Sequence, residues 1–138
     1  MQALEYDSKT YDAKLCLLNH QIIDEPQNAE MQIEVLKKEL RGKRKFILTN
    51  IEARYVGYQK HDEEKAIEIL ESVSKSFRDR QWYAVKRQLL ANSIEKHVQA
   101  KRDILANAYL KELEKLDNVV EQKYGDRILR DVDLLPDT

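Results

Sequence analysis

Apolar residues recur at helical spacing along most of the chain. The first stripe falls every three or four residues, as on one face of a helix, and predicts a helix over about residues 8–23. Ser8 is a suitable N-cap for this helix. Pro26 ends it, because the residue before a proline is pushed out of the helical region. The stripe consists of Tyr11, Leu15, Leu18 and Ile22.

A second stripe predicts a helix over about residues 28–58, with Asn28 as its N-cap. Gly42 lies inside this segment, where a glycine costs about 1 kcal/mol relative to alanine. We therefore expect the helix to kink or break near Gly42. Residues 46–49 are an alternative short strand, although no partner strand is evident. The stripe consists of Ile33, Leu36, Leu40, Ile47, Ile51, Tyr55 and Tyr58.

The second half of the chain is predicted to be one helical hairpin, because the stretch between Gly57 and Gly125 contains neither glycine nor proline. Asp62 is placed to cap the first arm, with Glu63 and Glu64 suiting the positive end of the helix dipole. The tight connection is expected at residues 78–80. The apolar face of this arm consists of Ala66, Ile69, Val73 and Phe77.

The second arm of that hairpin is predicted to run from Arg80 to Tyr124, with Asp79 as its N-cap and Gly125 as its left-handed end. A helix of this length would measure on the order of 65 Å at 1.5 Å per residue, which exceeds the diameter of a compact domain of this size. We expect it either to break at residues 92–93 or Asn107, or to project beyond the bundle.

These elements predict an all-α protein, an elongated helical bundle or coiled-coil-like array of about four helices with a long C-terminal helix. The bundle is expected to occupy residues 1–125, and residues 126–138 are expected to form a short, flexible tail that mixes acidic and apolar side chains. No internal repeat is recognisable in the sequence.

Composition supports long solvated helices and narrows the functional classes. Charged residues make up 36%, and there are only 3 Gly and 2 Pro. The single cysteine, Cys16, excludes an internal disulfide and is expected to be buried on an apolar stretch. The net charge of −1 gives no overall attraction to nucleic acid or membranes. No secretory leader or membrane span is recognisable, so a cytoplasmic location is expected.

A local basic run is the strongest charge feature. It could contact phosphates, and such binding would weaken steeply with salt. The alternative is a solvated helix face paired with acidic residues of other helices. The run consists of Lys37, Lys38, Arg41, Lys43, Arg44 and Lys45.

Carboxylate pairs offer a further alternative. Glu68 and Glu71 share one helix face, as do Glu114 and Asp117. Two such pairs on neighbouring helices could hold Mg²⁺, and they resemble the helical carboxylate pairs of the all-helical nucleotide pyrophosphatases. That resemblance implies a Mg²⁺-dependent nucleotide hydrolase, but the two pairs are further apart in sequence than in that family. The alternative is a pair of acidic solvent-facing surfaces.

Arginine and aromatic residues gather at the start of the last predicted helix. Trp, Tyr and Arg dominate the residues that carry binding energy in protein interfaces, whereas the alternative for the aromatic residues is core packing. We predict that this cluster, together with two tail residues, contacts a protein partner. The predicted contact residues are Arg78, Arg80, Trp82, Tyr83, Arg87, Leu134 and Leu135.

The sequence therefore predicts a non-enzymatic helical adaptor, chaperone or scaffold subunit that binds a protein partner, or a second copy of itself, through helix–helix contacts. A nucleic-acid-associated accessory protein that uses residues 37–45 is the alternative, and the nucleotide hydrolase comes third. No cofactor and no metal are expected. None of His20, His61 and His97 has a second His or Cys at the spacing of a metal site.

Overall fold

The computed structural model describes residues 2–125 and, from Thr10 onward, their side chains. This part of the chain is all-helical, with six α-helices and one short 3-10 helix, η1. The predicted tail at residues 126–138 lies outside the described residues. The elements are α1 (Gln2–Asp24), α2 (Pro26–Glu39), α3 (Lys43–Gln59), α4 (Glu63–Glu71), η1 (Lys75–Phe77), α5 (Arg80–Gln99) and α6 (Asp103–Tyr124).

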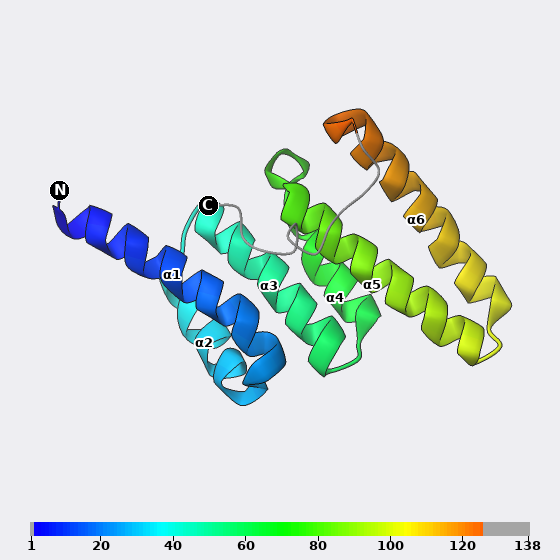
Figure 1. The fold of residues 1–138 in the computed structure, drawn as a ribbon, viewed down its shortest axis with the longest axis horizontal. Helices are drawn as coiled ribbons and strands as arrows, with labels where there is room; N and C mark the ends of the chain where they lie inside the picture. Colours follow the sequence, from blue (N-terminus) through cyan, green and yellow to red (C-terminus); the bar gives the residue numbers. More distant parts are fainter. Residues whose placement is uncertain (1, 126–138) are drawn as a thin grey trace.

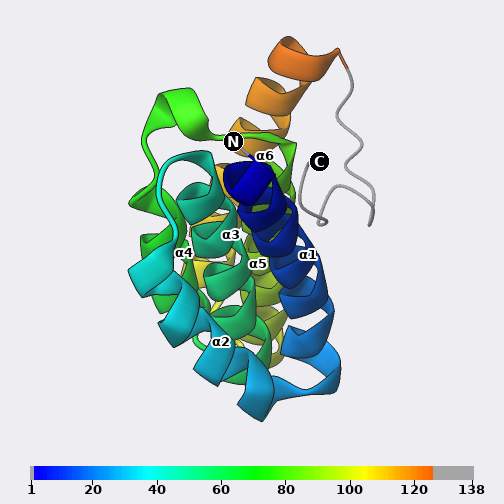
Figure 2. The same cartoon turned by 90° about the vertical axis from the view of Figure 1, so that its left-hand side faces the viewer.

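The helices form three antiparallel hairpins, α1–α2, α3–α4 and α5–α6, that stack side by side into an elongated array (Figures 1 and 2). Each new hairpin begins with a helix that packs on both helices of the hairpin before it. Thus α3 contacts α1 and α2, and α5 contacts α3 and α4. Helix α6, at the end of the described array, packs mainly on α5.

The prediction of about four helices is wrong, because two predicted helices are each divided in two. The first break lies at residues 40–42, near the expected position, where Gly42 adopts a φ of 65° that favours glycine. The alternative strand at residues 46–49 is also wrong, since these residues belong to α3. Helix α1 already begins at Gln2 rather than at Ser8.

The long arm predicted from Arg80 to Tyr124 is a second hairpin. It breaks at residues 100–102, not at residues 92–93 or at Asn107, and α6 folds back along α5. Lys101 takes a left-handed φ of 59°. The amide of Lys101 donates to the carbonyl of Val98 at 3.1 Å, and that of Arg102 donates to the carbonyl of His97 at 2.8 Å. These bonds satisfy the last carbonyls of α5 in the Schellman arrangement without a glycine.

Two of the four predicted N-caps, Asp62 and Asp79, are confirmed, whereas Ser8 lies inside α1 and Asn28 lies inside α2, whose N-cap position is Glu25 because Pro26 begins that helix. The carboxylate of Asp62 accepts a hydrogen bond from the backbone amide of Lys65 at 3.1 Å, and that of Asp79 accepts one from the amide of Trp82 at 2.9 Å. Each bond satisfies an amide that has no partner within its helix. Gly125 ends α6 with a φ of 75°, as expected for a left-handed C-cap.

The second and third hairpins repeat the same local geometry with an offset of forty positions. His61 and Lys101 are the left-handed residues of the two turns. Ala66 and Ala106 occupy the same position on the second helix of each hairpin, and both are buried. Ala29 is the corresponding buried alanine of the first hairpin. The array is therefore a degenerate structural repeat, although few side chains are shared between its units.

The core runs through the array along the facing stripes of α1 to α6. Helices α3 and α5 approach closely at Gly57 of α3, where a Cβ atom would lie 2.2 Å from Cδ2 of Leu89. Trp82 fills the space between α4 and α5 and is 2% exposed. Cys16, expected to be buried, is only half-buried on α1.

The turn at Lys101 gives a stability test. Replacing Lys101 with glycine should raise the free energy of unfolding by about 0.5–1 kcal/mol, because the left-handed conformation is costly for a residue with a Cβ atom. Lys111→Gly is the matched control. It places a glycine inside α6, where about 1 kcal/mol should be lost. Urea unfolding followed by circular dichroism measures both, and a destabilised Lys101→Gly would contradict the expectation.

Candidate protein-binding site

A basic groove lies where the end of α4, η1 and the start of α5 meet α6. Its volume is about 350 Å³. The floor comes from α5, one end from η1 and the residue after it, and one wall from α6. The lining residues are Lys75, Arg78, Trp82, Tyr83, Lys86, Glu112, Lys115, Leu116 and Val119.

Trp82 forms the floor of the basic groove and is fixed in place by the core beneath it. Its indole Nε1 donates to the backbone carbonyl of Leu70 at 2.8 Å, which ties the ring to α4. The guanidinium carbon of Arg78 lies 4.3 Å from the indole centroid, and Nζ of Lys86 lies 5.2 Å from it. Both distances are within the range of cation–π attraction.

Glu71 at the end of α4 positions the two cations beside Trp82. One carboxylate oxygen accepts from Nη2 of Arg78 at 3.1 Å, and the other accepts from Nζ of Lys86 at 2.5 Å. Nε of Arg78 also donates to the carbonyl of Val73 at 3.0 Å. These bonds join α4, the η1 segment and α5 at one point, so Arg78 is held over the ring rather than free in solvent.

Helix α6 supplies the apolar wall of the basic groove and a further cation. Leu116 and Val119 line the groove. Nζ of Lys123 donates to the carbonyl of Arg78 at 3.1 Å and lies 5.3 Å from the ring centroid of Tyr83. This contact links the end of α6 to the segment before α5.

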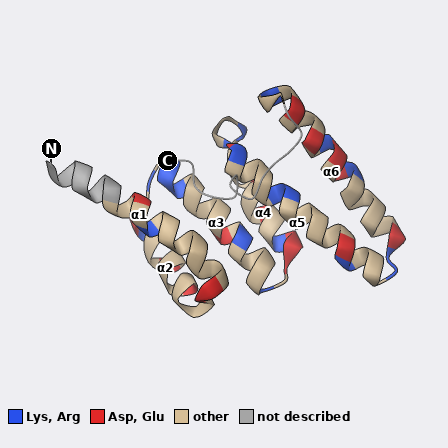
Figure 3. Cartoon of the chain, viewed as in Figure 1, with Lys and Arg blue, Asp and Glu red and all other residues tan. Residues whose placement is uncertain are grey.

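The groove carries an excess of positive charge. Four cations line it against the single carboxylate of Glu112. The side chains of Lys75 and Lys115 make no hydrogen bond or ion pair with other residues in the described part of the chain, so their charges are available to a ligand. Figure 3 shows positive residues gathered where the chain passes from α4 into α5.

The structure brings part of the predicted contact cluster together. Arg78, Trp82 and Tyr83 line the basic groove. Arg80 lies next to it, with its guanidinium carbon 4.8 Å from the ring centroid of Tyr124. Arg87 serves a different purpose, because its Nε donates to Asp117 at 3.0 Å and ties α5 to α6. The remaining two predicted contacts, Leu134 and Leu135, lie outside the described residues.

Sequence reasoning missed the α6 side of the groove. A single long helix would have placed those residues far from Trp82. The only available signal was the apolar pair Leu116 and Val119, three positions apart. The missed lining residues are Lys75, Lys86, Glu112, Lys115, Leu116 and Val119.

The basic run does not form one surface. Arg44 pairs with Asp12 of α1 at 2.9 Å, and Arg41 donates to backbone carbonyls of its own turn. Lys37 points the other way, into a groove between α2 and α4. The remaining cations of the run, Lys38, Lys43 and Lys45, are exposed.

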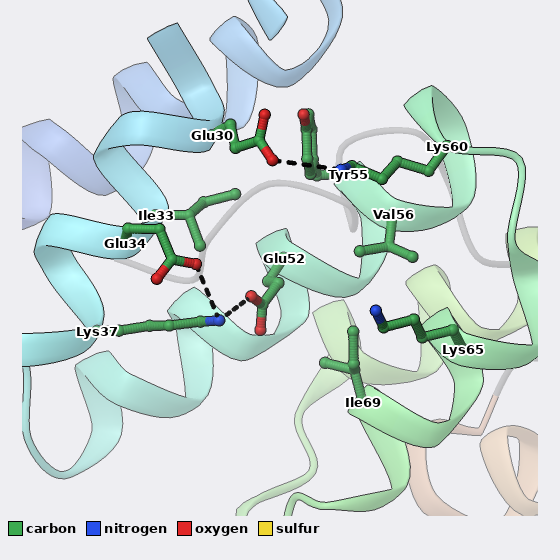
Figure 4. Close-up of a pocket in the computed structure, with 10 residues that line it drawn as sticks. All are labelled: Glu30, Ile33, Glu34, Lys37, Glu52, Tyr55, Val56, Lys60, Lys65 and Ile69. Carbon is green, nitrogen blue, oxygen red and sulfur yellow. Dashed lines mark hydrogen bonds and ion pairs between the residues drawn. The ribbon is translucent and has the colours of Figure 1, made fainter. Parts of the chain in front are cut away.

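The groove between α2 and α4 has α3 as its floor and balanced charge (Figure 4). Lys37 pairs with Glu34 and with Glu52, and Lys60 pairs with Glu30 at 3.2 Å. Burial lowers the pKa of Lys37, but the hydrogen bond and charge of Glu52, followed by Glu34, outweigh it and leave the pKa raised. The local pairing satisfies most of these charges, so nothing in this groove selects a ligand by charge.

The carboxylate pairs do not converge. Glu71 is held by Arg78 and Lys86, whereas Glu68 lines a separate groove between α3 and α4. Asp117, from the second predicted pair, is instead paired with Arg87 of α5. Over residues 2–125, no group of three or more His, Cys, Asp or Glu residues is arranged to hold a metal ion.

Within the described residues, no helix is both long and apolar enough to cross a membrane. Comparison of the chain with models of known protein families, with curated proteins and with solved structures finds no significant match to any of them. The basic groove, by its geometry and charge, is the feature of the described residues that most favours a function.

Proposed function

We propose that the protein is a non-enzymatic helical adaptor or scaffold subunit that binds another protein in the basic groove between η1, α5 and α6. The observation that carries this proposal is a buried tryptophan ring flanked by two positioned cations, beside an apolar wall on α6. This combination of Trp, Tyr and Arg in a preformed concavity is typical of the centre of a protein interface.

The charge and shape of the groove favour a partner segment that is acidic and carries aliphatic side chains. The cations at its rim would attract carboxylates, while Leu116 and Val119 offer apolar area to aliphatic groups. Because Arg78 and Lys86 are already held by Glu71, binding would cost little additional side-chain order at these two positions.

Charge reversal at the rim tests the proposal. The full chain carrying Lys75→Glu and Lys115→Glu is used as bait in a lysate of the cell that produces it, alongside the unaltered chain. We expect proteins captured by the unaltered chain to be recovered about fivefold less by the double variant, because two exposed charges that contribute roughly 0.5 kcal/mol each add to about 1 kcal/mol. Mass spectrometry with quantification measures the recovery.

Lys38→Glu with Lys43→Glu is the matched control, because it reverses two exposed lysines of the basic run at the other end of the array. This variant should capture the same proteins as the unaltered chain. Equal recovery by all three baits would overturn the proposal. If only the control variant captures fewer proteins, and nuclease treatment removes the same proteins from the unaltered bait, the nucleic-acid alternative is favoured instead.

A further inference from the structure

The chain itself contains a segment whose chemistry matches the basic groove. Residues 131–135 read Asp-Val-Asp-Leu-Leu, and Asp137 follows after Pro136. The segment from Asp131 to Thr138 therefore has three carboxylates, no cation and three aliphatic side chains. The groove presents the complementary set, with an apolar wall, one lining carboxylate and four lining cations, of which Arg78 and Lys86 are paired with Glu71, whereas Lys75 and Lys115 are not.

We infer that residues 131–135 occupy the basic groove of the same molecule, with their carboxylates near Lys75 and Lys115 and their leucines against Leu116 and Val119. This inference rests on the proposed function, because it assigns an internal occupant to the partner site. An acidic partner then binds by displacing this segment, so the free protein is partly inhibited by its own sequence.

The distance to be covered is short. Gly125 ends α6 immediately after Lys123 and Tyr124, which border the groove. The five residues from 126 to 130 span at most about 17 Å when extended. Val119 lies roughly 9 Å before Gly125 along the axis of α6 at 1.5 Å per residue. The connection is therefore long enough to return the segment along the α6 wall.

Tethering favours the internal occupant over a free peptide. A short linker gives an attached ligand an effective concentration in the millimolar range. Weak contacts with exposed lysines are therefore sufficient to keep the groove occupied, and a partner still competes if it binds more tightly.

Disulfide trapping in the full chain tests the inference directly. In a Cys16→Ser background, Val119→Cys is combined with Leu134→Cys. The matched control combines Leu110→Cys with Leu134→Cys. Val119 is 44% exposed and Leu110 is 41% exposed, and nine positions on a helix turn the two side chains to opposite sides of α6.

We expect the Val119→Cys pair to form an intramolecular disulfide about tenfold faster than the control pair under mild oxidation, because the tethered segment is concentrated in the groove. Adding Lys75→Glu and Lys115→Glu should slow the trapping by a similar factor. Non-reducing electrophoresis and peptide mass analysis measure both rates.

Equal rates for the two cysteine pairs, or trapping that ignores the lysine charges, would overturn the inference. Disulfide-linked dimers in place of monomers would also overturn it, since the occupant would then be a second copy. The proposed function is tested separately. If partner capture depends on Lys75 and Lys115 but no disulfide is trapped, the proposed function stands and this inference fails. If the disulfide is trapped but no such capture is found, only the internal contact stands.

Discussion

Replacing Trp82 with alanine should lower the free energy of unfolding by about 3–5 kcal/mol, the cost of emptying a large buried aromatic site. Trp82 is 2% exposed and joins α4 to α5 through its hydrogen bond to the carbonyl of Leu70. The substitution leaves that carbonyl without its partner and removes the ring beneath Arg78 and Lys86. Because both the packing of the ring and its hydrogen bond are lost, this is one of the largest effects expected of a single substitution in the chain.

Urea unfolding followed by far-ultraviolet circular dichroism measures the effect, since Trp82 is the only tryptophan and fluorescence is lost with it. Trp82→Phe keeps an aromatic ring but removes the donor, and should cost about 1–3 kcal/mol. Tyr58→Ala, on the exposed side of α3, is the control and should change stability by about 0.5 kcal/mol or less. A loss below that of the control would show that Trp82 does not hold the hairpins together.

Gly57→Val should destabilise the protein by about 3 kcal/mol, because α3 and α5 meet where a Cβ atom would lie 2.2 Å from Leu89. Leu89 is itself buried, so its side chain has little space to move aside. Gly57→Ala adds a single carbon and gains about 1 kcal/mol of helix propensity, so its net cost should be smaller.

The control for this substitution is Ala108→Val on the exposed side of α6, where only the lower helix propensity of valine, roughly 0.6 kcal/mol, is at stake. Both variants are compared by urea unfolding at one temperature. If Gly57→Val is no more destabilising than Ala108→Val, the two helices do not approach as closely as the structure shows.

The helices themselves were predictable from local chemistry. The apolar stripe of α1 and the caps Asp62 and Asp79 required only neighbouring residues, and the structure confirms both caps. The turn before Asp62 was predicted from that cap, whereas the turn at Lys101 was not, because a residue other than glycine occupies the left-handed region there. Tertiary packing of α6 on α5 compensates for that local cost. No glycine or proline near Lys101 marks the turn in the sequence.

The candidate site was predictable only on one side. Trp82 and Tyr83 stood out because aromatic residues beside arginine are typical of interfaces. The α6 wall required the fold, because Leu116 and Val119 reach Trp82 only after the chain reverses at Lys101. The basic run shows the reverse case, in which residues close in sequence do not form one surface. Its cations are adjacent in sequence, but the break at Gly42 directs Lys37 and Arg44 toward different carboxylates.

The stacking of hairpins has a consequence for how the chain folds and opens. In the described part of the chain, the main outside contacts of the first hairpin and those of the third hairpin are both with the second, so each end unit depends chiefly on its neighbour. In such a linear array, cooperativity passes from unit to unit, and the end unit separates at the lowest cost. The end unit here includes α6, which forms a wall of the basic groove. The surface proposed to bind a partner thus lies on one of the two end units, and an occupied groove would join η1, α5 and α6 into one cooperative unit.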